Sequence, residues 1–407
     1  MMRISYGRNR DLRRMAGSGH EDDWSDETLL LSLGRNPRAQ HGFVNTPIYR
    51  GSTVLFPSYD ALVAYEQEYT YGRRGTPTVR ALEGAIASLD GGHRTWVAPS
   101  GLAAITAVLM AFTQAGDHIL VADTVYQPTR RVSDRLMKRY GVAVTYYDPL
   151  IGAGIADLIT DRTKLVFAEV PGSQTFEMMD IPAITAACRE RGVWLAVDNT
   201  WATPLYCKPL ALGADIALMA ATKYIVGHAD AMLGLITANE RAAPFVARAH
   251  EDLGLCAGPE DCFLGLRGLR TLGVRLARHG ESALAMARWL QERPEVSRVL
   301  HPALPGDPGH ALWRRDFTGS SGLFSIVLHP VSKPALAAFL DGLKLFGMGY
   351  SWGGYESLII PFDASSYRTA TKWSPEGQTL RLHIGLENPE DLQADLSAAF
   401  QRMAEVR

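Results

Sequence analysis

Lys223 differs from the other lysines of this 407-residue chain in its surroundings. Six of the seven lysines lie among polar, charged or proline neighbours, where a solvated ammonium is expected. Lys223 instead follows an apolar run, Ile216 to Ala221, that is typical of a buried strand. Burial lowers the pKa of an ammonium, so Lys223 could provide the neutral amine that forms a Schiff base. The alternative for this residue alone is a lysine that only caps the end of a strand.

Asp198 and Tyr126 each follow an expected strand and could complement such an amine. Asp198 ends the apolar run from Val193 to Val197, and a buried carboxylate there is costly unless a cation, such as a pyridinium nitrogen, lies beside it. Tyr126 could stack its ring on a planar cofactor. Taken singly, Asp198 could equally cap the following turn, and Tyr126 could equally lie at the edge of the core.

The start of an apolar helix supplies a candidate phosphate site. Gly101 and Leu102 directly follow a short strand, so their free backbone N–H groups and the helix dipole could hold a phosphate. Thr222 adds a hydroxyl donor beside Lys223. A lysine, a carboxylate, a tyrosine and a helix start at the ends of four strands together indicate pyridoxal phosphate, held as a Schiff base on Lys223.

Alternating strands and helices must position these residues. Apolar runs predict strands at 94–98, 118–122, 142–147, 165–170, 193–197, 215–219 and 232–237. Helices are expected at 59–69, 102–112, 129–139 and 181–191. After a helical stretch from the 240s to 291, a second α/β module has strands at 324–328 and 380–384 and helices at 334–340 and 391–406. This order is typical of an α/β fold with a mostly parallel sheet, whose ligands collect at the carboxyl ends of the strands.

Composition and motifs exclude several other classes. The formal net charge of −2 gives no electrostatic reason to expect nucleic acid or an anionic membrane as a partner. No apolar stretch approaches the roughly 20 residues of a membrane span. The sequence contains neither a glycine-rich nucleotide-binding motif nor HExxH, and its four cysteines form no CxxC pair, so we expect no metal. Few cysteines and no apolar signal segment predict a reduced, cytoplasmic compartment.

Seven dispersed blocks resemble the Cys/Met-metabolism family of pyridoxal-phosphate enzymes. The blocks are Tyr71-Gly-Arg-Arg-Gly-Thr-Pro-Thr, Ser100-Gly-Leu-Ala-Ala-Ile, Val197-Asp-Asn-Thr-Trp-Ala-Thr-Pro, Ala221-Thr-Lys-Tyr, Arg267-Gly-Leu-Arg-Thr-Leu, Ser351-Trp-Gly-Gly-Tyr-Glu-Ser-Leu and Arg381-Leu-His-Ile-Gly-Leu-Glu. The resemblance implies the fold type I of pyridoxal-phosphate-dependent transferases, similar to aspartate aminotransferase. That fold has a mostly parallel sheet in its large domain and a smaller C-terminal α/β domain.

The resemblance also implies a division of the chain and an assembly. It implies an arm at 27–75 that reaches a neighbouring subunit, a cofactor-binding domain at 76–270 and a C-terminal domain at 271–407. Residues 1–26 lie outside the resemblance, and their polar, charged composition predicts a flexible tail. The implied assembly is a homotetramer built from two dimers that share active sites.

Each matched residue takes an implied role from the resemblance. Lys223 would carry the cofactor and shuttle the Cα proton, Asp198 would hold the pyridine nitrogen, and Tyr126 would stack on the ring and assist amine exchange. The implied phosphate ligands are Gly101, Leu102, Thr222 and, from a neighbouring subunit, Tyr71 and Arg73. The implied substrate-binding residues are Arg381, whose guanidinium fork suits the α-carboxylate, Ser351, Trp352 and Tyr71.

Two positions depart from the family pattern. Ala220 stands where relatives commonly carry a phosphate-binding serine, so one phosphate contact is expected to be missing. Arg131 stands where some β-lyases carry an acidic residue towards the distal end of the substrate. The resemblance therefore assigns no partner to a distal ammonium.

Within the family, the doubled arginine of the first block and the Ser-Trp-Gly-Gly-Tyr-Glu-Ser block resemble the cystathionine β-lyases. This implies a carbon–sulfur lyase of methionine biosynthesis, which cleaves L-cystathionine by β-elimination to homocysteine, pyruvate and ammonia. The alternatives are a cysteine-S-conjugate β-lyase or cysteine desulfhydrase, and an enzyme of the cystathionine γ-synthase or methionine γ-lyase type. A cofactor-binding regulator without turnover is disfavoured, because Lys223, Tyr126 and Arg381 are all present.

Overall fold

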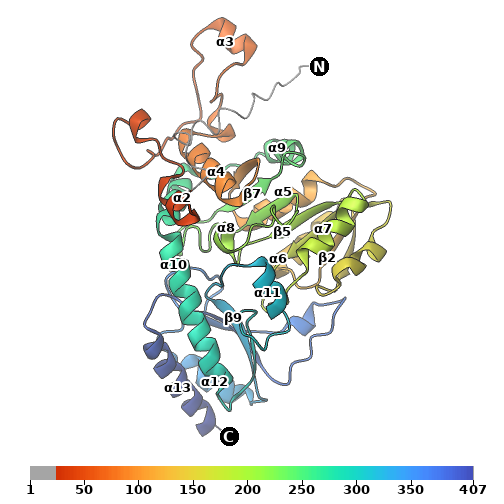
Figure 1. Ribbon diagram of the computed structural model, residues 1–407, viewed down its shortest axis with the longest axis vertical. Helices are drawn as coiled ribbons and strands as arrows, with labels where there is room; N and C mark the ends of the chain where they lie inside the picture. Colours follow the sequence, from red (N-terminus) through yellow and green to blue (C-terminus); the bar gives the residue numbers. More distant parts are fainter. Residues whose placement is uncertain (1–23, 407) are drawn as a thin grey trace.

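The computed structural model describes residues 24–406 as a larger and a smaller α/β unit joined by one long helix (Figure 1). The larger unit contains a seven-stranded sheet and the smaller unit a four-stranded sheet. Most of the expected polar tail, residues 1–23, lies outside the described residues. Helix α2 (Asp26–Ser32) begins at the last residue of that expected tail.

The strands of the large sheet have the order β1-β7-β6-β5-β4-β2-β3. They are β1 (Arg94–Ala98), β2 (His118–Ala122), β3 (Ala143–Tyr147), β4 (Thr163–Glu169), β5 (Trp194–Asp198), β6 (Ile216–Met219) and β7 (Gly234–Ala238). Strands β3, β2, β4, β5 and β6 pair in parallel, and β7 pairs antiparallel with both β6 and β1. Every strand except β7 therefore ends at the same edge, which confirms the mostly parallel α/β fold.

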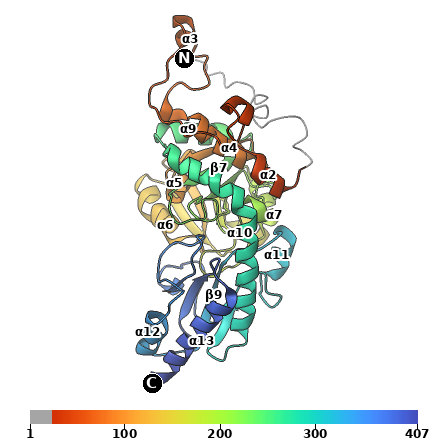
Figure 2. The ribbon, with the colours of Figure 1, turned by 90° about the vertical axis from the view of Figure 1, so that its left-hand side faces the viewer.

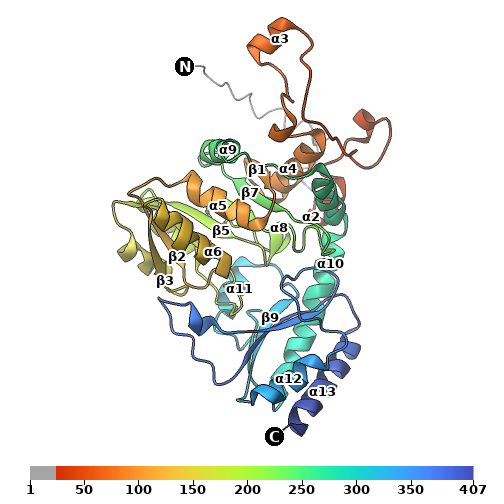
Figure 3. The same cartoon turned by 180° about the vertical axis from the view of Figure 1, so that it is seen from behind.

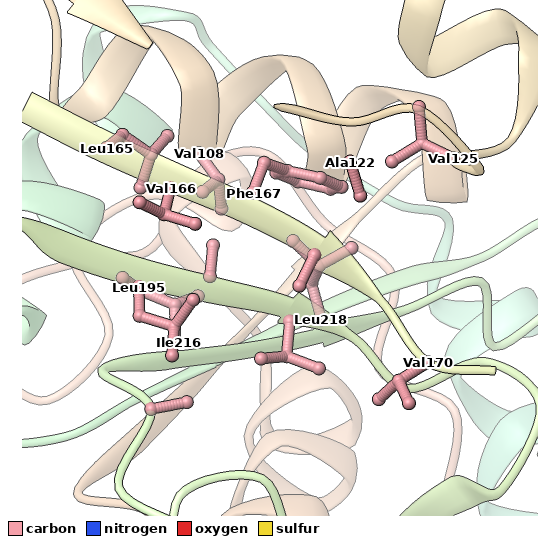
Figure 4. Close-up of a cluster of buried hydrophobic side chains, with 14 of the residues drawn as sticks. Val108, Ala122, Val125, Leu165, Val166, Phe167, Val170, Leu195, Ile216 and Leu218 are labelled. Carbon is pink, nitrogen blue, oxygen red and sulfur yellow. The ribbon is translucent and has the colours of Figure 1, made fainter. Parts of the chain in front are cut away.

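The central strands are apolar between their ends because helices cover both faces of the sheet. Figure 4 shows Val166, Phe167, Leu195 and Ile216, all fully buried, lying beside one another on adjacent strands. Val108 of helix α5 (Gly101–Ala111) belongs to the same buried cluster. This core holds the strand ends at fixed spacing.

The other helices of the larger unit are α4 (Pro77–Asp90), α6 (Gln127–Arg131), α7 (Ile181–Glu190), α8 (Thr203–Tyr206) and α9 (Ala243–Asp252). The expected helix at 129–139 starts earlier and continues as a π-helical turn, Val132–Met137. Helix α4 was not predicted, although Thr76 caps it and proline occupies its first turn, a common helix start.

The smaller unit is a sheet of order β10-β11-β9-β8, antiparallel throughout. Its elements are β8 (Val296–Leu300), β9 (Leu323–Leu328), β10 (Leu358–Phe362), β11 (Thr379–His383), α11 (His310–Asp316), α12 (Lys333–Asp341) and α13 (Pro389–Glu405). The two strands that were not predicted, β8 and β10, are the edge strands. Edge strands are less buried, and β10 contains Pro361, which weakens the strand pattern.

Helix α10 (Pro259–Gln291) runs through both units without a break (Figure 2). Leu269 and Leu276 pack into a cluster of the larger unit, whereas Met286 and Leu290, near the end of the helix, pack into the core of the smaller unit. The domain boundary expected at residue 270 therefore falls inside one helix. The helix stops packing against the larger unit after Leu276 and begins to pack against the smaller unit at Ala283.

Residues 35–75 extend away from the rest of the molecule and carry helix α3 (Tyr59–Ala64) at their tip (Figure 3). The helix expected at 59–69 is shorter because Tyr65 adopts a left-handed φ of 56°, with its N–H bonded back to Ala61 and Leu62. Where the arm returns to the body, Thr53 pairs with Tyr71 in an isolated β-bridge.

Candidate active site

Residues from four strands meet at the carboxyl edge of the large sheet. Gly101 follows β1, Tyr126 follows β2, Asp198 ends β5 and Lys223 follows β6. A Cβ atom placed on Gly101 would lie 2.5 Å from the Cβ of Ala220, so the start of α5 is pressed against the turn that carries Lys223. The sheet thus brings together the lysine, the carboxylate, the tyrosine and the helix start.

Lys223 is held between an aromatic ring and a hydroxyl. Its Nζ donates a hydrogen bond to Ser351 Oγ at 2.8 Å and lies 5.4 Å from the centre of the Trp352 ring. Burial lowers the pKa of Lys223 to about 8; the nearby Arg381 adds to this shift and Asp198 opposes it. An ammonium with this pKa loses its proton at a lower pH than an ordinary lysine, so more of the nucleophilic neutral amine is present.

Asp198 is a buried carboxylate at the end of β5. Its Oδ1 accepts from Thr200, from the backbone N–H at 3.0 Å and from the hydroxyl at 2.5 Å. Burial raises the pKa of Asp198 to about 6, although the Thr200 hydrogen bonds and the charge of Lys223 oppose the shift. Among residues 24–406 no side chain forms an ion pair with Asp198, so the site can accept a cation from a ligand.

The start of α5 and the turn after β6 form a cradle of backbone N–H groups and a hydroxyl. Ser100 Oγ accepts from the Ala103 N–H at 3.1 Å, which leaves the N–H groups of Gly101 and Leu102 without an intrahelical acceptor. The Thr222 hydroxyl accepts from the Leu233 N–H at 2.9 Å and donates to the Leu233 carbonyl oxygen at 3.2 Å, so the N–H groups of Gly101 and Leu102 are the free donors of the cradle. These donors suit a phosphate group.

A second carboxyl group at this edge, Glu169, was not predicted. It ends β4 directly beside Asp198 in the strand register, and its Oε2 accepts from the Tyr126 N–H at 2.6 Å. Burial and the neighbouring Asp198 raise the pKa of Glu169 well above its usual value, although the Tyr126 N–H opposes this. Glu169 thus anchors the backbone of Tyr126, whose side chain remains half exposed over the site. The only signal in the sequence was its position at a strand end.

Arg381 reaches the site from β11 of the smaller unit. Its Nη2 donates to the Ser351 carbonyl at 2.9 Å, and its buried Nε has no partner among the described residues. Burial lowers the pKa of Arg381 to about 10. A buried guanidinium with an unpaired N–H beside the Lys223 amine can bind the carboxylate of an amino acid.

Tyr71 and Arg73 do not join the other predicted site residues within this chain. Arg73 Nη1 donates to the carbonyl of Glu251 near the end of α9, at 3.3 Å, and the Tyr71 side chain is half exposed on the arm. No described contact links either residue to Lys223 or Asp198. Both side chains remain available to a second molecule.

These residues fit pyridoxal phosphate. The cradle beside Gly101 suits the phosphate, the unpaired buried carboxylate of Asp198 suits a protonated pyridine, and Lys223 offers the amine. A family model described as Cys/Met metabolism PLP-dependent enzyme matches residues 27–401. The chain belongs to this family. Pyridoxal phosphate is its cofactor.

Individual relatives support the Cys/Met-metabolism assignment along almost the whole chain. Cystathionine β-lyase of Escherichia coli is 43% identical over 388 residues, covering 93% of this chain and 98% of that enzyme. L-alanine/L-glutamate racemase of Wolbachia pipientis is 40% identical over 394 residues, covering 93% and 97%. The crystal structure of cystathionine γ-synthase from Xanthomonas oryzae, in complex with aminoacrylate and cysteine, matches with a TM-score of 0.86 at 33% identity, covering 94% and 100%.

The two departures from the family pattern are visible in the structure. Ala220 carries no hydroxyl, and its N–H donates to Thr200 Oγ1 at 2.9 Å instead of facing the cradle. Arg131 is exposed on α6, where its Nη2 lies 3.4 Å from Gln127 Oε1, one turn back towards Tyr126.

Residues 24–406 contain no group of three His, Cys, Asp or Glu side chains placed to hold a metal ion. Within the same residues, no helix combines the length and the apolar character needed to cross a bilayer.

Proposed function

We propose that this chain is a carbon–sulfur lyase that cleaves L-cystathionine by β-elimination to homocysteine, pyruvate and ammonia. The observation that carries the proposal is the partly desolvated amine of Lys223, which lies near both Asp198 and the unpaired guanidinium N–H of Arg381. The choice of cystathionine rests on the similarity to the Escherichia coli enzyme. Such a lyase serves methionine biosynthesis.

Different side chains would bind the substrate, remove the Cα proton and hold the cofactor. Arg381 binds the substrate α-carboxylate and so orients Cα towards Lys223, whose neutral amine removes the Cα proton. Ser351 accepts a hydrogen bond from that amine and fixes its direction. Bound pyridoxal phosphate supplies the electron sink that makes the Cα proton acidic. With the cofactor bound, Asp198 would hold its pyridine nitrogen and Tyr126 would cover its ring. Breaking the Cβ–S bond would release homocysteine, whose sulfur takes up a proton, and water would hydrolyse the remaining three-carbon fragment to pyruvate and ammonia.

Product analysis tests the proposal. The purified, cofactor-loaded protein should convert L-cystathionine into equal amounts of pyruvate and a free thiol. Formation of 2-oxobutyrate would instead show γ-elimination. If S-ethyl-L-cysteine were consumed far faster than cystathionine, the enzyme would be a broader cysteine-S-conjugate lyase.

The Wolbachia relative supports a second candidate, amino-acid racemisation. Racemisation begins with the same removal of the Cα proton, but the proton then returns to the opposite face of Cα and the Cβ bond stays intact. Incubation with L-alanine and L-glutamate, followed by chiral separation, distinguishes the two reactions. Accumulation of D-amino acid without pyruvate from cystathionine would replace the lyase proposal.

Arg381→Ala should lower kcat/KM for cystathionine by about ten- to a hundredfold. Hydrogen bonds to charged groups contribute roughly 1.5–3 kcal/mol, and this one acts on substrate binding as well as on the transition state. Arg381→Lys keeps the charge but loses the planar fork, so it should fall between wild type and alanine. Unchanged steady-state kinetics for Arg381→Ala would assign the carboxylate to another residue.

The arm, residues 27–75, joins a second copy of the chain in this proposal. It exposes a series of large apolar side chains that the rest of the chain leaves uncovered, with Leu55 85% exposed. These side chains are Phe43, Val44, Ile48, Tyr49, Leu55, Tyr59, Leu62, Val63, Tyr65 and Tyr71. Apolar surface on this scale marks an interaction site. In a symmetric dimer each arm would bring Tyr71 and Arg73 to the phosphate of the other subunit's site.

Subunit mixing tests this sharing of sites. Lys223→Ala and Arg73→Ala, each nearly inactive, are dissociated and reassociated in equal amounts. Random pairing makes about half of the dimers mixed, and each mixed dimer then holds one intact site, so roughly one quarter of all sites should recover. No recovery beyond the sum of the parents, with exchange verified by mass labelling, would place Tyr71 and Arg73 in their own subunit's site.

Two of the dimers in which each arm reaches the other subunit's site would pair into a homotetramer. The cofactor-binding domain would comprise residues 76–270 and the C-terminal domain residues 271–407. All four cysteines are unpaired, three of them buried, which suits a reducing cytoplasm.

A further inference from the structure

Alternate residues of β11 face opposite sides of the small sheet. Leu380 and Leu382 are buried in the core of the smaller unit. Arg381 and His383 point the other way, and both form hydrogen bonds with the segment 351–353. One short strand therefore presents two polar side chains to the segment that contacts Lys223.

The hydrogen bonds of His383 define its protonation. The Gly353 N–H donates to His383 Nε2 at 3.0 Å, so Nε2 must be an unprotonated acceptor. His383 Nδ1 lies 3.0 Å from the Glu356 carbonyl and therefore carries the proton. Burial, and beyond it the nearby His279, Arg381 and Lys223, hold the pKa of His383 well below its usual value. His383 is a neutral imidazole that can accept from Gly353.

The segment that His383 holds has an unfavourable backbone. Ser351 has a φ of 93° and Gly353 a φ of 85°, and a side chain costs free energy in this region. A Cβ on Gly353 would lie only 3.0 Å from the Cα of Lys223, so the segment is packed directly on the lysine backbone. Such a conformation persists only when the surrounding structure fixes it.

Two anchors from β11 provide this restraint. Arg381 Nη2 donates to the carbonyl of Ser351, and His383 Nε2 accepts from the N–H of Gly353. Ser351, the first anchored residue, also carries the hydroxyl that accepts from Lys223. Trp352 lies between Ser351 and Gly353 in the chain, and its ring is beside the same amine. A shift of the Gly353 end would move both groups relative to the amine.

We propose that His383 is a positioning residue for catalysis. By accepting the Gly353 N–H it keeps Ser351 and Trp352 against the Lys223 amine and keeps the Arg381 guanidinium aligned for the substrate carboxylate. His383 touches neither substrate nor cofactor in this role and acts through the segment 351–353. The kinetic part of its test rests on the proposed lyase function.

Two amide variants separate the hydrogen bond of His383 to Gly353 from its hydrogen bond to Glu356. His383→Gln places an amide oxygen near the position of Nε2 and can still accept from Gly353. His383→Asn places its amide near Nδ1 and can donate to Glu356, but it leaves the Gly353 N–H without an acceptor. We expect kcat/KM for cystathionine to stay within about threefold of wild type in His383→Gln. In His383→Asn it should fall by about ten- to a hundredfold, because a misplacement of about 1 Å has an effect of this size.

Binding of glycine gives a readout that needs no turnover. Glycine has a carboxylate for Arg381 but no Cβ substituent to eliminate, and its binding changes the visible absorbance of the bound cofactor. The Kd for glycine should rise about tenfold in His383→Asn and stay near wild type in His383→Gln. If wild type bound glycine but did not cleave cystathionine, the lyase proposal would fail while the positioning role could still be judged.

His279→Asn is the matched control for loss of a buried ring. His279 lies 5.2 Å from His383 between ring centres, and its Nδ1 bonds to the Ile384 carbonyl, without contacting the segment 351–353. It should lower Tm about as much as His383→Asn and leave both kcat/KM and the glycine Kd near wild type. Equal losses in the Gln and Asn variants of His383, or wild-type values in both, would overturn the positioning role.

Discussion

Replacing Lys223 by alanine should remove both turnover and the visible absorbance of the bound cofactor. Six other lysines are present, but none of them follows a strand end at the carboxyl edge beside Asp198. Loss of a general base alone lowers rates by about 10²–10⁴-fold, and loss of the covalent attachment adds to this. Lys164→Ala, which removes an exposed lysine of β4, serves as the control and should behave as wild type. A Lys223→Ala protein with normal absorbance and activity would refute the active-site assignment.

The pH dependence of Lys223 can be measured without cofactor. Only the neutral amine reacts with an acylating reagent, so labelling should be slow below pH 8 and rise through a midpoint near the lowered pKa of about 8. An unperturbed lysine would give a midpoint near about 10.4. Peptide mass spectrometry distinguishes Lys223 from the other lysines. A midpoint above pH 10 would mean that the amine is not desolvated as the structure shows.

Asp198→Asn should retain cofactor but lower kcat by roughly two to four orders of magnitude. A neutral amide cannot balance the charge of a protonated pyridine, and breaking a buried ion pair costs about 3–5 kcal/mol. Burial raises the pKa of Asp198 to about 6, so in the cofactor-free protein its charge is present above pH 6 and lost below it. Cofactor affinity should therefore weaken as the pH falls through 6 in wild type and change less in Asp198→Asn.

Asp180→Asn is the matched control for the Asp198 variant. Asp180 caps helix α7 at the surface, and asparagine caps helices as well as aspartate does. This variant should show normal kcat and a normal pH dependence of cofactor binding. If Asp198→Asn also had a kcat near wild type, Asp198 would not serve as the partner of the pyridine nitrogen.

The large sheet and its functional edge were predictable because strands buried on both faces are apolar throughout. The runs before Asp198 and Lys223 have this pattern, and a parallel sheet places the residues after them at one edge. The edge strands β8 and β10 lack the pattern. The middle residues of β8 are partly exposed to solvent, and β10 contains Pro361. Local periodicity identifies buried strands well and exposed ones poorly.

Contacts between distant segments were not predictable from periodicity. Glu169 lies beside Asp198 only through the register of β4 and β5, and nothing in its local sequence marks a carboxyl group next to Asp198. His383 likewise acquires its role from a loop some thirty residues earlier in the chain. The protonation of both side chains depends on burial, which a single sequence does not report.

Helix α10 restricts where the two units of this chain could be separated. Its first half contributes leucines to the larger unit and its second half contributes apolar residues to the smaller one. A cut before Leu276 or after Ala283 would strip one fragment of part of its core and expose an apolar stripe on the other. Exchange of the smaller unit between relatives would therefore be expected to succeed best with a junction in the short stretch of α10 between Leu276 and Ala283.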